Sequence, residues 1–119
     1  MAINSYAELG PYIDSILDAN GESPVAKAHK NFWDTLTYQE FTTGNVPNVV
    51  DPTTMQPIKI LVVGNSGVSA IIQALTGTVG SIFDPNTGTI GQMPANGPPF
   101  FTAAQIAPIS AWIDAGCPQ

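Results

Sequence analysis

The sequence predicts one mainly α-helical domain spanning residues 1–119, with about four to five helices joined by long loops rich in glycine and proline. A length of 119 residues suits one domain. Several segments place apolar residues at helical spacing after a Ser or Thr that can cap a helix. The segments between them contain most of the turn-forming residues, and neither an internal repeat nor a second domain is visible.

The first helix is predicted by a capping-box pattern, in which Ser5 is followed three residues later by Glu8. Asn20-Gly21 supplies its end. Its expected apolar face consists of Tyr12, Ile13, Ile16 and Leu17. A second, short helix is expected to start at Ser23-Pro24 and to run through about Trp33.

The middle of the chain predicts two more helices separated by a loop. Thr37 and Glu40 form another capping box, leading into a short helix that ends near Gly44. Residues 44–57 contain three prolines and few periodic apolar residues, so we expect a loop there. A fourth helix is expected over about 67–75, ended by Gly77.

The C-terminal helix has the clearest signals. Thr102 and Gln105 complete a capping box, and Gly116 is well placed just beyond the C-terminus. Pro108 lies inside the pattern and is expected to weaken or kink the helix, because it removes one backbone donor. The apolar face contains Ile106, Ile109, Trp112 and Ile113.

The segment before this helix, QMPANGPP at 92–99, is expected to be a stiff, extended loop that holds Met93 in one place. A Met-Pro-x-x-Gly-Pro-Pro loop followed by a helix ending in Ala-Trp-Ile-Asp-x-Gly resembles the C-terminal part of class I cytochrome c domains in large bacterial multi-domain proteins. The resemblance implies a cytochrome c-like fold, with the N- and C-terminal helices packed together. It also implies that Met93 is the distal axial ligand of a haem iron.

The family carries a Cys-x-x-Cys-His haem attachment motif after the first helix, and this chain departs from it. The best-matching segment is Val25-Ala26-Lys27-Ala28-His29, which keeps the only histidine in the chain but neither cysteine. Covalent haem attachment at this position is therefore not possible. His29 and Met93 together would suit noncovalent haem. Copper(I) ranks below haem, because two ligands alone make a poor copper site.

A domain of this kind without haem must either fill the cofactor space or keep a pocket there. Five aromatic residues are the candidates for filling the space or lining the pocket: Phe32, Trp33, Phe100, Phe101 and Trp112. The leading interpretation is a haem-less, cofactor-free, non-enzymatic domain that binds a protein partner or a small apolar ligand. The alternative is an electron carrier with noncovalent haem held by His29 and Met93.

Two further motifs suggest enzymes, but neither is complete. The stretch Lys59–Val68 resembles the start of a phosphate-binding loop, but it lacks the lysine that such a loop needs. Ser66 lies in a turn that resembles a nucleophilic serine turn, but its one candidate base is His29, which nothing in the sequence positions. A hydrolase is therefore the lowest-ranked alternative, and we expect no enzyme and no metal site.

The charge balance restricts the partners. Three lysines, no arginine and nine acidic residues give a net charge of −6. This argues against nucleic acid and anionic membranes, and any protein partner is expected to be basic. No apolar run approaches the ~20 residues of a membrane span, and no signal peptide is visible, so the cytoplasm is the default location. The single Cys117 excludes an intrachain disulfide.

Overall fold

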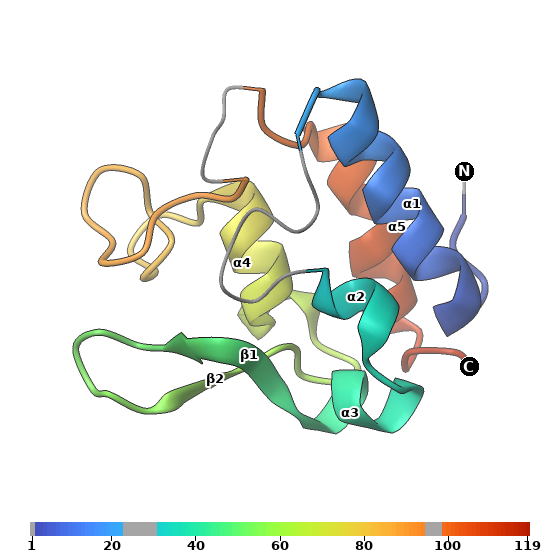
Figure 1. Cartoon of the computed structure of the whole chain (residues 1–119), viewed down its shortest axis with the longest axis horizontal. Coiled ribbons are helices and arrows are strands. Elements are labelled where there is room, and N and C mark those ends of the chain that lie inside the picture. The colour runs from blue at the N-terminus through green and yellow to red at the C-terminus, as the bar shows by residue number, and fades with distance from the viewer. Residues whose placement is uncertain (1, 23–30, 95–98) are drawn as a thin grey trace.

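The computed structural model describes residues 2–22, 31–94 and 99–119. Figure 1 shows the first and last helices side by side, with the shorter elements beneath and beside them. The described part contains five α-helices, one short 3-10 helix and two strands. In chain order these are α1 (Tyr6–Ala19), α2 (Phe32–Thr35), α3 (Tyr38–Thr43), β1 (Asn45–Val50), β2 (Pro57–Lys59), η1 (Ser66–Val68), α4 (Ala70–Thr76) and α5 (Ala103–Asp114).

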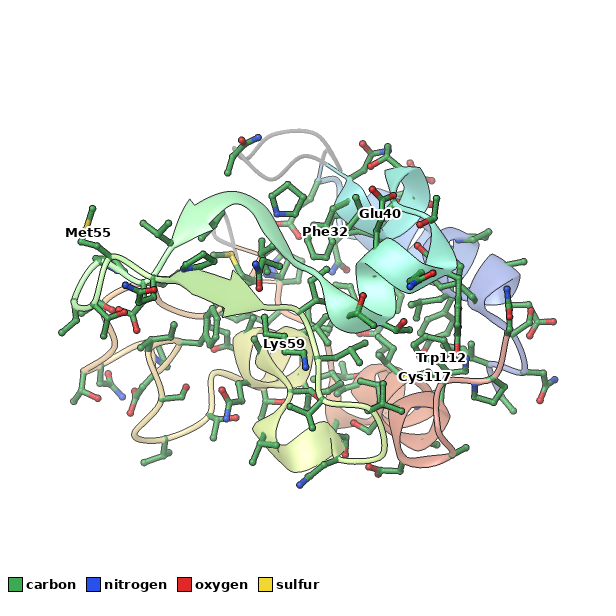
Figure 2. All side chains as sticks on the ribbon, turned by 90° about the horizontal axis from the view of Figure 1, so that it is seen from below. Phe32, Glu40, Met55, Lys59, Trp112 and Cys117 are labelled. Atoms are coloured by element: carbon green, nitrogen blue, oxygen red, sulfur yellow. The ribbon has the colours of Figure 1, made fainter. Side chains whose placement is uncertain are left out.

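The two strands show that the prediction of a mainly α, cytochrome c-like fold is wrong. β1 and β2 form a two-stranded antiparallel sheet, with Met55 in the turn that connects them (Figure 2), so the domain combines helices with a small sheet. Residues 44–57 were expected to be a loop because of their prolines. In a two-stranded sheet, however, each strand has a free edge, and edge strands tolerate prolines because not every N–H is needed for the ladder. Pro47 lies within β1 and Pro57 begins β2. Val46, Val49 and Val50 favour extended backbone in the same strand.

Two of the three predicted capping boxes are confirmed. The hydroxyls of Thr37 and Thr102 each accept a hydrogen bond from the backbone N–H three residues on, and the reciprocal side-chain bonds are present. The third prediction is wrong, because no capping box forms at Ser5. Ser5 makes no side-chain cap hydrogen bond, and the Glu8 carboxylate accepts instead from the backbone N–H of Asn4, at 2.8 Å.

The predicted fourth helix is interrupted by Ser69. Its side chain is fully buried, donates to the carbonyl of Asn65 at 2.8 Å and accepts from the N–H of Val62 at 2.9 Å. The extended backbone at Ser69 separates η1 from α4. The end of α4 is confirmed, because Gly77 adopts the left-handed conformation with a φ of 64°.

The core is built mainly from the buried side chains of α1 and α5, to which α2, α3, α4 and the segment after β2 add one or two residues each. The Tyr12 hydroxyl donates to the carbonyl of Gln105 at 2.6 Å, which links the first helix to the last. The rings of Tyr6 and Trp112 stack with their centroids 6.3 Å apart. Among the described residues, no helix is long and apolar enough to cross a membrane. Within the described ranges, the most deeply buried side chains other than Ser69 are Leu9, Phe41, Ile60, Leu61, Ile109, Trp112, Ile113 and Cys117.

Candidate functional site

The helix α5 presents two different faces. Ile109, Trp112 and Ile113 lie on one of them and are almost completely buried in the core. The other face carries small or short side chains, which recur three to four residues apart and therefore lie in one row along the helix. These residues are Ala103, Ala107, Ser110, Ala111 and Asp114.

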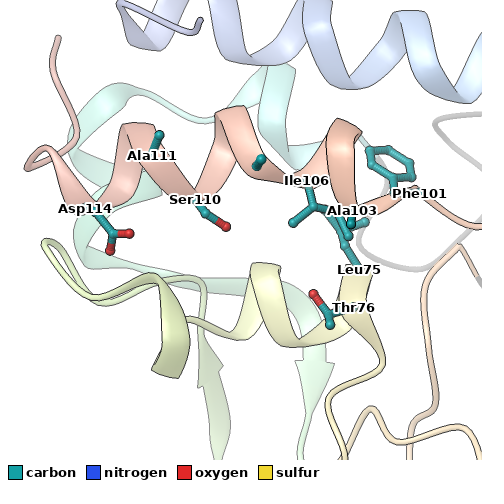
Figure 3. A pocket seen from close by; sticks show the side chains of 9 residues that line it. Leu75, Thr76, Phe101, Ala103, Ile106, Ser110, Ala111 and Asp114 are labelled. Atoms are coloured by element: carbon teal, nitrogen blue, oxygen red, sulfur yellow. The ribbon is translucent and has the colours of Figure 1, made fainter.

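This second face forms one wall of an open groove of about 610 Å³ (Figure 3). Leu75 and Thr76, at the end of α4, line the opposite side, and Phe101 lies just before α5. Ile106 lies between the two walls of the groove. The groove exists because alanine and serine side chains are too short to fill the space between the two helices.

A hydrogen-bonded clip fixes the Asp114 end of the groove. The Asp114 carboxylate accepts from the backbone N–H of Ser66 at 2.8 Å and from the Ser66 hydroxyl at 2.9 Å. The backbone N–H of Gly64 donates to the carbonyl of Ile113 at 3.0 Å. These bonds hold the turn before η1 against the end of α5.

A second set of bonds fixes the end of α4. The backbone N–H of Met93 donates to the carbonyl of Ala74 at 2.8 Å, and the Gln92 side-chain amide donates to the carbonyl of Leu75 at 3.1 Å. A Cβ atom on Gly77 would lie 2.8 Å from the Gln92 side chain, which would have to move away from its present position. Both walls of the groove are therefore attached to neighbouring segments.

The predicted haem ligands are only partly covered by the described residues. Met93 is half-buried in the segment attached to α4. His29 lies outside the described residues, so the His29–Met93 pair stays a prediction. The alternative of a noncovalent haem carrier rests on that pair and stays a prediction with it.

The five predicted aromatic residues occupy different environments. Phe101 lines the groove. Phe32 and Trp112 lie in the core, 6% and 1% exposed respectively. Trp33 is half-buried and donates its indole N–H to Asp14 at 2.7 Å, and Phe100 is half-buried. Phe101 belongs to the same buried cluster as Phe32 and Trp112, and it also lines the groove.

The two enzyme-like motifs have structural roles in the described chain. Ser66 belongs to the clip, where both its hydroxyl and its backbone N–H donate to Asp114. Its predicted partner His29 lies outside the described residues, so that pairing stays a prediction. In the phosphate-loop-like stretch, Ile60 and Leu61 are buried in the core and the backbone then turns at Gly64, which has a φ of 83°.

Sequence reasoning missed a pair of acidic residues between α1 and α2. Asp14 accepts from the Trp33 indole, and Asp34 lies against Gly10, where a Cβ would be only 2.2 Å from the Asp34 Oδ1. Asp34 is exposed overall, but partial desolvation, together with the hydrogen bond and negative charge of Asp14, raises its pKa from 3.8 to about 6, although a hydrogen bond from Asn31 opposes this. A glycine inside the first helix was the one sequence signal for this contact.

In the part of the chain that the structure describes, no group of three or more His, Cys, Asp or Glu side chains is placed to hold a metal ion. Comparison with known proteins finds no matching family model and no significantly similar curated protein or solved structure.

Proposed function

We propose that this domain is a non-enzymatic binding protein that takes a small apolar ligand in the groove between α4 and α5. The observation that carries the proposal is the groove itself. Its volume of about 610 Å³ falls in the range of about 300–1,000 Å³ that is typical of small-molecule sites. Its lining also has the usual composition, with mostly apolar side chains and a few polar groups. The polar groups are Thr76, Ser110 and Asp114.

The attachment of both walls supports the same proposal. The clip at Asp114 holds one end of α5, and the bonds from Gln92 and Met93 hold the end of α4. A groove with fixed walls is largely formed before its ligand arrives. Binding then costs less conformational entropy than it would if the ligand had to order the two helices.

A titration with 1-octanol, a neutral apolar probe, tests the proposal. Two-dimensional amide NMR spectra are recorded on the full chain as the probe is added, below its solubility limit. We expect saturable shifts at groove residues such as Thr76, Ala107 and Ser110. The shifts are expected to be absent at the tip of the hairpin, around Met55.

A matched pair of variants identifies the site. Ala107→Phe places a large side chain in the groove and is expected to abolish the saturable shifts. Ala104→Phe adds the same side chain at an exposed position of α5 that does not line the groove, and is expected to leave them intact. If 1-octanol causes no saturable shifts, or if Ala107→Phe binds it as the unmodified chain does, the proposal is refuted.

A further inference from the structure

The two ends of the groove differ in charge. In Figure 3, Phe101, Leu75 and Ile106 gather at one end together with the uncharged Thr76, and Asp114 lies at the other. Each of the three apolar side chains is at least nine-tenths buried, so each exposes only a small apolar area at this end of the groove. Ser110, with its short hydroxyl side chain, lies on α5 between the two ends.

The spacing of the two ends sets a length for the ligand. Ile106 and Asp114 are eight residues apart on one helix, which corresponds to about 12 Å along its axis. A compact ring system does not reach both ends over that distance. A linear chain does, with its apolar part beside Ile106 and a polar group beside Asp114.

Asp114 has hydrogen-bonding capacity left for such a polar group. The backbone N–H and hydroxyl of Ser66 each use one acceptor position, and an ionised carboxylate offers about four. Within residues 2–22, 31–94 and 99–119, no lysine forms an ion pair with Asp114. The side chain is exposed at the groove end and is the one charged group among the lining residues described.

We infer that the ligand of this groove is a linear amphiphile with a protonated amine at one end, and this inference rests on the proposed function. The apolar chain lies along α5 from Phe101 and Ile106, and the ammonium group donates to the free acceptor positions of Asp114. The net charge of −6 attracts the same ligand and repels a fatty-acid carboxylate. A partly exposed ion pair adds selectivity here rather than most of the affinity.

Three probes with the same chain length test the inference: octylammonium, 1-octanol and octanoate. Each is titrated into the full chain at pH 7 and low ionic strength, below its critical micelle concentration, and the groove amides are followed by NMR. Octylammonium is expected to bind about fivefold more tightly than 1-octanol, a factor that corresponds to about 1 kcal/mol. Octanoate is expected to bind more weakly than either.

Asp114→Asn removes the charge but keeps a carbonyl that can accept from the Ser66 N–H and an amide that can donate to its hydroxyl. We expect this variant to bind octylammonium and 1-octanol about equally. Asp18→Asn is the matched control, because it makes the same change in net charge at an exposed position of α1 outside the groove. It is expected to retain the preference for octylammonium.

The outcomes separate the two proposals. If no probe causes saturable shifts in the groove, the proposed function fails, and the inference fails with it. If 1-octanol binds in the groove but octylammonium shows no advantage, the function stands and the charged ligand is refuted. A preference that Asp18→Asn removes as fully as Asp114→Asn does would also refute the inference, because it would come from net charge alone.

Discussion

The carboxyl pair of Asp14 and Asp34 predicts an unusual dependence of stability on pH. The pKa of Asp34 is about 6 in the folded chain, against 3.8 for an unperturbed aspartate. Between these two values the folded state binds more protons than the unfolded state, so the free energy of unfolding falls as the pH rises from about 4 to about 6. The fall continues through the pKa near 6 and ends about one pH unit above it. A carboxylate that forms an ion pair with a basic residue usually has a lowered pKa, so its contribution to stability increases as the pH rises.

The magnitude follows from the position of the pair. A change in pKa from 3.8 to about 6 would correspond to about 3 kcal/mol if none of it were screened. The Asp34 side chain is exposed to solvent, which reduces the expected effect to about 1 kcal/mol. Tyr6 does not titrate in this range, because burial and the charges of Asp34 and Glu40 raise its pKa above 10.0.

Urea unfolding at several pH values between 4 and 7 measures this effect. Asp34→Asn mimics the protonated carboxyl, since its amide can donate to Asp14. We expect it to be about 1 kcal/mol more stable than the unmodified chain at pH 7, and about equal to it near pH 4. Asp18→Asn has the same change in net charge and is expected to follow the unmodified chain. If Asp34→Asn and the unmodified chain show parallel pH profiles, the reasoning is wrong.

Two further substitutions test backbone conformation and core packing by urea unfolding. Gly77→Ala is expected to cost more than Gly21→Ala, because both glycines have positive φ but only the new Cβ at 77 would crowd the Gln92 side chain. Equal costs would contradict that contact. Trp112→Phe is expected to cost about 2–4 kcal/mol, because it leaves a cavity and removes the indole hydrogen bond to the Pro118 carbonyl. A cost below about 1 kcal/mol would mean that the core readjusts around the smaller ring.

The helix ends were predictable because their signals are local. A capping box at Thr37 or Thr102 depends on residues only three positions apart, and the left-handed end at Gly77 depends on one glycine. Ser5 has the same pattern, but the carboxylate of Glu8 reaches the N–H of Asn4 instead. A local pattern therefore locates a helix start more reliably than it identifies the hydrogen bonds made there.

The sheet and the acidic pair were not predictable in the same way. The strands β1 and β2 pair as a hairpin, with Asn45 opposite Lys59 and Val50 opposite Pro57, but the prolines of this stretch favoured a loop. Asp14 and Asp34 come together because α2 packs on α1 at Gly10. Neither contact leaves a periodic signal in the sequence. Both depend on how the elements pack.

The position of the groove could not be predicted from the sequence either, because it also depends on how the helices pack. Sequence reasoning searched for a pocket among five large aromatic residues. Phe32 and Trp112 fill the core, and of the five Phe101 alone lines the groove. The open space lies instead where α5 presents Ala107 and Ser110, which are too small to close it. A groove forms where the side chains of neighbouring elements are too small to fill the space between them. Small residues on one face of a helix are therefore a better sequence indicator of a groove than large aromatic residues are. Because the groove depends on their small size, a single enlarged side chain at Ala107 is expected to abolish binding without disturbing the core on the other face of α5.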